Sequence, residues 1–155
     1  MTKKYKLHVI QDDTSFLNLQ KDWYDFEKSI NHKNITSSFD WLITWWDVFK
    51  NVNDFQLGFD KKLIIICIYV DRKLVAIAPF VKVKRKKLGI NISFIEFLGQ
   101  QWGGNYLDII AGDFNIHCKS IIFKWLYDNV KFDSIFLKYI PDTTKYFNHA
   151  KLILY

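Results

Sequence analysis

Cysteine and histidine are scarce in this sequence, and their placement excludes two classes of protein. The 155 residues include two cysteines, Cys67 and Cys118, and four histidines. Two cysteines make no disulfide framework, and each lies in an apolar run that suits a small buried side chain, so a reducing compartment is expected. The histidines are far apart, without the His-x-x-x-His or Cys-x-x-Cys spacing of a metal site. The sequence therefore predicts neither a disulfide scaffold nor a metalloenzyme.

Long apolar runs are also missing. The longest, residues 63–70, is far shorter than the ~20 residues that a membrane-spanning helix needs. The first ten residues lack the apolar centre and cleavage site of a signal peptide. No repeat, low-complexity segment or Pro/Ser-rich linker divides the chain. We therefore expect a single domain over residues 1–155, no transmembrane segment and a cytoplasmic location.

The chain is rich in apolar and basic residues. Half of it is hydrophobic and 18% is aromatic, which excludes a disordered chain and predicts a densely packed core. The net charge of +6 permits an anionic partner such as nucleic acid, acidic lipid, a nucleotide diphosphate or coenzyme A. The densest basic run, residues 82–87, is most simply a solvated hairpin tip because like charges need water. Phosphate binding is the alternative role for this run.

A tryptophan-rich segment, residues 37–49, is predicted to form a central helix. At 100° per residue, Trp41, Trp45 and Trp46 fall in one arc of about 160° together with the neighbouring apolar residues Leu42, Val48 and Phe49. Ser37, three residues before Asp40, is the predicted N-cap. A wide indole face usually packs into a core, and the alternative is that it lines a ligand site.

Apolar periodicity predicts two further helices and six strands. The helices span about residues 12–31 and 112–130. The strands are expected at residues 5–10, 63–70, 74–81, 90–98, 106–111 and 133–140. The second and third strands should form an antiparallel hairpin, in which Pro79 marks a bulge, an edge or a point where strands splay. Turns or element starts are expected at residues 71–73, 85–89, 141–144 and 150–155. These elements predict a mixed α/β (α+β) fold with a largely antiparallel central sheet.

The glycine-rich loop at residues 99–105 leads toward the candidate chemistry. A phosphate-binding loop precedes a helix, whereas this one precedes a predicted strand, so its glycines are expected to admit a substrate close to the backbone. In an apolar strand, the carboxyl groups of Asp108 and Glu96 would have raised pKa values that suit a general base. Tyr106 could exchange a proton beside Asp108. The alternative is that both carboxylates lie on a solvated face or pair with lysine.

Two other kinds of chemistry are absent from the sequence. No serine lies in the Gly-x-Ser-x-Gly context of a nucleophile elbow. Aromatic residues and lysines alternate in places, but no RNA-binding signature or recognition-helix pattern accompanies them. We therefore expect no nucleic-acid partner.

Four segments, taken in order, resemble one known family. They are Ser-Phe-Asp-Trp-Leu-Ile-Thr-Trp-Trp-Asp-Val-Phe at 38–49, Leu-Val-Ala-Ile-Ala-Pro-Phe at 74–80, Phe-Leu-Gly at 97–99 and Asn-Tyr-Leu-Asp-Ile-Ile at 105–110. Together they look like the N-terminal half of the BioF2-like, cellulose-biosynthesis-type acetyltransferases. Those proteins belong to the GCN5-related N-acetyltransferase (GNAT) superfamily and are similar to Fem-type aminoacyltransferases.

The resemblance implies a three-layer α/β/α sandwich that transfers an acyl group. The implied co-substrate is acetyl-CoA or another acyl-CoA, and the implied acceptor is an amine or hydroxyl of a small molecule, such as a sugar or cell-envelope precursor. A second GNAT-like half is an implied partner. The alternative is a non-catalytic module that binds substrate or docks to a partner and has no acyl-CoA site of its own.

Site residues follow from the resemblance and from the loop. Asp108 and Tyr106 are the predicted catalytic residues, and the predicted substrate-binding residues are Trp41, Trp45, Trp102 and Asn105, with Trp46 supporting them. The superfamily binds the coenzyme A pyrophosphate through an Arg/Gln-x-x-Gly-x-Gly/Ala segment. The nearest match, residues 85–91, lacks the second small residue and precedes a strand. No cofactor-binding residue is therefore assigned.

Overall fold

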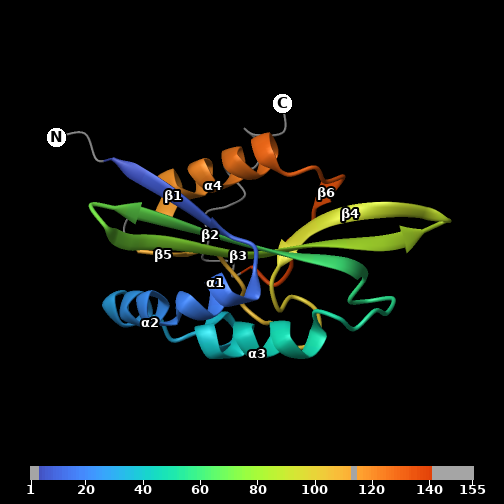
Figure 1. Ribbon diagram of the computed structural model, residues 1–155, viewed down its shortest axis with the longest axis horizontal. Helices are drawn as coiled ribbons and strands as arrows, with labels where there is room; N and C mark the ends of the chain where they lie inside the picture. The colour runs from blue at the N-terminus through green and yellow to red at the C-terminus, as the bar shows by residue number, and fades with distance from the viewer. Residues whose placement is uncertain (1–3, 113–114, 141–155) are drawn as a thin grey trace.

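A computed structural model describes residues 4–112 and 115–140, which form three layers. Figure 1 shows helices α1, α2 and α3 against one face of a twisted sheet and helix α4 against the other face. The sheet runs in the order β1-β2-β3-β4-β6, and the short strand β5 also pairs with β3. All pairings are antiparallel except that of β4 with β6. The predicted mixed α/β fold with a largely antiparallel sheet is confirmed.

The first three strands form one side of the sheet, with β1 at its edge. Strands β1 (Tyr5–Ile10), β2 (Phe59–Val70) and β3 (Lys73–Lys87) are consecutive neighbours. The run at residues 63–70 is buried on both faces, with the single exception of half-buried Tyr69. Alternate residues of β2 therefore enter two separate cores, as expected for a β-branched run between two helical layers. Residues 59–62, expected in a loop, instead extend β2 along β3.

The helix expected over residues 12–31 is two helices. Helices α1 (Asp13–Asn18) and α2 (Gln20–Ser29) are separated by Leu19, whose amide donates to the Phe16 carbonyl, three residues back. Asp12 caps α1, as predicted, by accepting from the Ser15 amide at 2.8 Å. Because Leu19 keeps a helical φ of −74°, the apolar spacing continues across the break and conceals it from sequence periodicity.

The tryptophan helix is α3 (Phe39–Phe49), and its N-cap differs from the prediction. Ser38 accepts from the Trp41 amide, whereas Ser37 is buried in the preceding 3-10 turn η1 (Ile35–Ser37) and bonds His32. Phe39, Leu42, Trp45 and Trp46 form the buried face. Val48, predicted on this face, is 56% exposed, because the sheet contacts a narrower arc than the apolar pattern covers.

The sheet parts beside Pro79, which is one of the three positions foreseen for this proline. On one edge of β3, residues 80–87 pair with β4 (Ile90–Phe97) and residues 76–77 pair with β5 (Ile110–Ala111). The Pro79 carbonyl accepts from the Leu98 amide as β4 departs. The expected strand at residues 106–111 is wrong before residue 110, because residues 99–109 cross this opening as a loop. The expected turn at 85–89 is also wrong, since β3 continues to Lys87 and only residues 88–89 turn.

Helix α4 (Asn115–Asn129) and strand β6 (Ser134–Ile135) complete the described fold. Cys118, Ile122 and Leu126 are the fully buried residues of α4, whereas Ile116 and Tyr127 are 55% and 75% exposed although their apolar spacing favours the same face. The strand expected at 133–140 is limited to two paired residues. The predicted elements at residues 141–144 and 150–155 lie outside the described residues, as does Asp113 at the predicted helix cap.

Candidate functional site

The glycine loop, defined as residues 99–109, rests on the N-terminal half of α3. The Trp45 indole donates to the Gln101 carbonyl at 2.8 Å. The Trp41 ring lies against Gly99 and Gly103, where a Cβ atom would come within 3.4 Å of its ring atoms. The Trp41 Nε1 atom is buried and has no hydrogen-bond partner among the described residues. Both tryptophans therefore contact the loop backbone directly and hold the loop in position.

Gly104 is the tightest position in this loop, and replacing it tests the packing. A Cβ atom there would lie 2.3 Å from the Gly99 carbonyl oxygen and 2.8 Å from Leu107 Cδ1. Because the first contact is with backbone, we expect Gly104→Ala to lower the free energy of unfolding by about 1–3 kcal/mol, measured by urea denaturation. Gly112→Ala is the control, since its methyl group meets only the end of the Ile30 side chain at 3.2 Å. Equal losses in the two variants would contradict the predicted clash.

The polar segment before α3 holds the far end of the loop. Asn34 Nδ2 donates to the Tyr106 carbonyl at 2.5 Å, and Thr36 Oγ1 donates to the Asn105 carbonyl. Two non-glycine residues of the loop have positive φ, Trp102 at 62° and Tyr106 at 55°, and their side chains are 58% and 67% exposed. These bonds fix the backbone while leaving two large aromatic side chains in solvent. Asn105 is exposed as well.

Asp108 lies at the other side of the sheet opening and faces α4. Its Oδ1 atom is 3.6 Å from Lys119 Nζ, and the two side chains are 20% and 12% exposed. Burial lowers the pKa of Lys119, although the nearby Asp108 charge opposes this shift. The prediction that Asp108 sits inside a strand is wrong, because strand pairing begins only at Ile110. The alternative considered for it, pairing with a lysine, is what the structure contains.

The predicted site residues therefore divide into two groups. Trp41, Trp45, Asn105 and Tyr106 are held by α3 and η1 on one side of the sheet opening. Asp108 pairs with α4 on the opposite side. Sequence reasoning missed Lys119, because nothing in its local pattern distinguishes it among the 22 Lys and Arg residues of the chain. Helical spacing from buried Cys118 was the available signal, since it places residue 119 beside the covered face.

Glu96 is the most deeply buried carboxylate of the described residues, at 1% exposure. Arg85 donates to both of its oxygens, through Nη1 to Oε1 and through Nη2 to Oε2 at 2.9 Å. Gln101 Nε2 lies 3.3 Å from Oε2, and Arg85 also donates to the Gln56 carbonyl. The expectation that Arg85 is part of an exposed tip is wrong. Glu96 has an arginine partner in place of the anticipated lysine, and this pair secures the start of the glycine loop.

Gln100 connects the same region to the segment after β6. Its Nε2 atom donates to the Phe136 carbonyl at 2.9 Å, and its Oε1 atom accepts from the Lys138 amide at 2.8 Å. The side chain is 1% exposed. The Gln100 side-chain amide therefore gives hydrogen-bond partners to two backbone groups that lie beyond the last pair of the β4–β6 ladder. The space between the two parallel strands is therefore bridged at this level.

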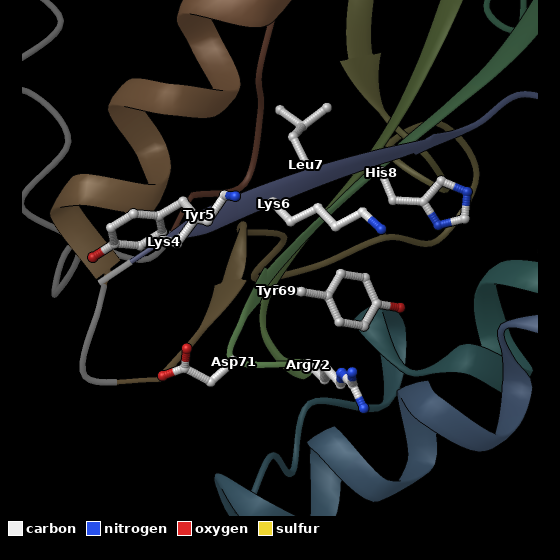
Figure 2. Close-up of a pocket in the computed structure, with 8 residues that line it drawn as sticks. All are labelled: Lys4, Tyr5, Lys6, Leu7, His8, Tyr69, Asp71 and Arg72. Carbon is white, nitrogen blue, oxygen red and sulfur yellow. The ribbon is translucent and has the colours of Figure 1, made fainter. Parts of the chain in front are cut away.

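A separate pocket of about 860 Å³ lies at the edge strand β1. Figure 2 shows Lys6 and His8 of β1 beside Tyr69 of β2, and the Tyr69 hydroxyl donates to Asp22 of α2 at 3.3 Å. Lys4 and Arg72 add further cations to its lining. Strands β2 and β3 separate this pocket from β5, so it is not part of the predicted site. No sequence motif marked it, because its residues come from two strands, β1 and β2, and from the β2–β3 turn.

His32 supports the η1 segment and gives a pH-dependent test of it. Burial lowers the pKa of His32 below 6.5, and its Nε2 atom lies 2.8 Å from Ser37 Oγ. Below pH 6.5 the unfolded chain therefore binds the proton first, so stability falls as pH drops from 6.5 toward the folded-state pKa. We expect a slope of at most about 1.4 kcal/mol per pH unit that is absent in His32→Gln.

The measurement is urea denaturation of both proteins between about pH 7.5 and about pH 5, the range in which an imidazole titrates. Burial raises the pKa of Glu27, which contributes a slope of opposite sign in both proteins. Only the difference between the two proteins reports His32. Parallel curves for the two proteins would show that His32 does not titrate with folding.

Two negative findings concern the described residues only. Among residues 4–112 and 115–140, no group of three or more His, Cys, Asp or Glu side chains is arranged to hold a metal ion. None of the helices in those ranges has the length and apolar character needed to span a bilayer.

Comparisons with known proteins give no family assignment. No family model matches the chain, and no curated protein matches it. Among solved structures, an aminoglycoside acetyltransferase from an uncultured soil metagenomic sample is 13% identical with a TM-score of 0.46, over 98% of this chain and 88% of that chain. A ribosomal-protein-alanine N-acetyltransferase from Brucella melitensis biovar Abortus is 6% identical with a TM-score of 0.44, over 96% and 90%.

A third structure, a GNAT family acetyltransferase from Staphylococcus aureus, is 13% identical with a TM-score of 0.41, over 93% of this chain and 96% of that chain. This chain is thus similar in its course to solved acetyltransferases. At such identities and TM-scores, the likeness supports no conclusion about substrate, co-substrate or reaction. Those conclusions need the residues of this chain.

Proposed function

We propose that this chain serves acyl transfer from an acyl-CoA to an amine or hydroxyl acceptor. The observation that carries the proposal is the opening of the sheet beside Pro79, where the glycine loop crosses between β4 and β5. The loop presents exposed Trp102 and Tyr106, and it ends at the Asp108–Lys119 pair. Aromatic side chains and an acid–base pair at one opening suit the binding of a polar acceptor. The motif resemblance of residues 38–110 supports the same function.

In this proposal the carbon–sulfur bond of the thioester breaks, and the coenzyme A thiolate leaves and takes a proton from the Tyr106 hydroxyl. The acceptor nitrogen or oxygen attacks the acyl carbon and gives up its own proton. Asp108, which Lys119 holds beside α4, receives that proton, and Tyr106 stands two residues away as a hydroxyl donor. Exposed Trp102 and Asn105 contact the acceptor, while Trp41 and Trp45 keep the loop in place through Gly99, Gly103 and Gln101. A sugar or cell-envelope precursor is the proposed acceptor, because exposed aromatic and amide side chains suit polyhydroxylated rings.

A second candidate is a substrate-binding or docking module that relies on a second GNAT-like half for its acyl-CoA. The specific observation in its favour is that residues 85–91 do not fit a pyrophosphate. They form the end of β3, a two-residue turn and the start of β4, and Arg85 is committed to Glu96. The hydrogen bonds of Gln100 also favour the module, because they bridge the segment after β4 to residues 136–138.

Titration with acetyl-CoA distinguishes the two candidates. If the chain binds acetyl-CoA itself, its melting temperature should rise with ligand concentration, because a ligand of the native state stabilises it by mass action. ADP is the control for non-specific attraction of phosphates to a basic protein. A shift with acetyl-CoA that exceeds the shift with ADP, together with acetylated amino-sugar product detected by mass spectrometry, supports the enzyme. Equal shifts and no product favour the module.

A further inference from the structure

The β3–β4 hairpin extends beyond both helical layers. In Figure 1 its turn is one extreme of the molecule along the longest axis, well past the ends of α3 and α4. We call residues 82–95 the hairpin arm. The loop at residues 51–58 lies against it, because Arg85 donates to the Gln56 carbonyl and Gly58 packs on the Lys84 carbonyl. The arm is therefore held firmly at its base while its tip has no covering element among the described residues.

The turn of the arm places a large aliphatic side chain where the backbone favours a polar one. Leu88 and Gly89 both have positive φ, 51° and 83°, as two-residue hairpin turns require. Leucine is poorly suited to this conformation, which Asn, Asp and Gly adopt more readily. The β2–β3 turn, with the same sign of φ, has Asp71 in the corresponding position. Leu88 is 95% exposed, so neither the turn nor the core explains its presence.

Other exposed apolar residues accompany Leu88. Ile90, on the other side of the turn, is 67% exposed, and Phe55 in the adjoining loop is 90% exposed. Lys87 pairs with Ile90 across the arm, so a cation lies directly beside the two aliphatic side chains. The tip thus combines apolar side chains with positive charge at one end of the molecule.

Positive charge continues along one face of the arm. Lys82, Lys84 and Lys86 alternate along β3 on the face that α4 covers farther along the strand, and Lys62 pairs with Lys82 from β2. Residues 54–62 and 82–96 together contain seven Lys or Arg residues and three carboxylates. Their surplus of four positive charges is most of the net charge of +6. Two of the carboxylates are committed to partners, Glu96 to Arg85 and Asp60 to Lys84.

We propose that the hairpin arm docks this protein on the surface of an anionic lipid bilayer. Leu88 and Ile90 enter the boundary between headgroups and acyl chains, and the lysines of β3 contact the lipid phosphates. Burial of aliphatic side chains and attraction of lysines to anionic headgroups are the two contributions that bind peripheral proteins. A nucleic acid fits the tip less well, because Leu88 and Ile90 offer bases neither a ring to stack on nor a hydrogen bond. This inference does not rest on the proposed acyl transfer.

The test is co-sedimentation of the full chain with vesicles of phosphatidylcholine alone and of equal parts phosphatidylcholine and phosphatidylglycerol. We expect binding to the anionic vesicles only, and weaker binding as salt is added, because exposed charges are screened. Leu88→Asn should weaken binding about tenfold, and Lys86→Gln with Lys87→Gln about 25-fold. Because Asn suits a positive φ, the first variant should remain folded, which thermal denaturation verifies.

Matched variants elsewhere on the surface serve as controls. Leu17→Gln removes a leucine of α1 that is 55% exposed, and Lys28→Gln with Lys33→Gln removes two exposed lysines from the α2 end. Both control proteins should bind anionic vesicles like the unchanged chain. The proposal is overturned if anionic vesicles do not bind, or if the Leu88 and Leu17 variants lose affinity equally. It is also overturned if the arm lysines bind a single-stranded oligonucleotide while Leu88→Asn leaves vesicle binding unchanged.

Discussion

Arg85→Met should lower the free energy of unfolding by about 3–5 kcal/mol, the largest loss of stability that we predict for a single substitution. The substitution leaves the Glu96 carboxylate, which is 1% exposed, with the Gln101 amide at 3.3 Å as its remaining side-chain partner among the described residues. A buried charge that loses its counter-ion keeps its desolvation cost and loses the attraction that offset it. Urea denaturation at neutral pH measures the loss.

The double variant Arg85→Met with Glu96→Leu separates the pair from the packing. Removing both charges also removes the desolvation cost, so we expect most of the stability to return. Lys124→Met is the matched control, because the Lys124–Asp128 pair is exposed, at 77% and 47%, and such pairs contribute little. If Arg85→Met is no more harmful than Lys124→Met, the buried pair does not stabilise the fold. A double variant as unstable as the single one would attribute the loss to the arginine stem.

Asp108→Asn should reduce acyl transfer by about 10²–10⁴-fold if Asp108 is the proton acceptor. The amide keeps the shape of the side chain and its place beside Lys119, but it does not accept the proton that the attacking amine or hydroxyl releases. The ion pair with Lys119 at 3.6 Å is lost at the same time, so the melting temperature is measured with the rate. Product formation by the folded variant, followed by mass spectrometry with saturating acetyl-CoA, gives the rate.

Asp128→Asn is the control for this prediction. Asp128 also pairs with a lysine on α4, at 2.8 Å, but it lies far along the helix from the glycine loop. We expect its transfer rate to match that of the unchanged chain. Unchanged transfer in Asp108→Asn would remove the carboxylate from the proposed reaction. Loss of folding in Asp108→Asn would instead assign the residue to the structure of the loop.

Local patterns predicted most of the elements. Strand β1 was predicted to the residue, and the runs that became β2, β3 and β4 were recognised because β-branched residues fill them. The helical spacing of Phe16, Trp23 and Phe26 was correct even though Leu19 divides that helix. Errors gathered at ends and turns. Arg85 lies in a strand opposite Ile92, and its side chain reaches Glu96 farther along the neighbouring strand, a contact that no window of sequence along one strand contains.

The candidate site was predicted less completely than the fold. Sequence placed Trp102, Asn105, Tyr106 and Asp108 in one stretch of chain, and the structure places them on one loop. It also shows that Trp41 and Trp45 support that loop from α3 and that Asp108 pairs with Lys119 of α4. Those partners are 11 to 62 positions distant from the loop residues that they contact, so no local pattern records them. The substrate-binding and catalytic roles of these residues remain predictions.

The sequence by itself determined the class of fold, the composition of the core and the absence of a disulfide framework, because each depends on residue type and on spacing within one element. The continuous apolar run of β2 already indicated a strand buried on both faces, and its two faces enter the two cores that the helical layers cover. Tertiary structure alone decided where the sheet opens beside Pro79, which charges are paired and which apolar side chains stay exposed. Leu88 and Leu42 are the same residue type at 95% and 0% exposure. Their exposed fractions differ only because the folded chain packs other residues against Leu42 and leaves Leu88 at the tip of a hairpin.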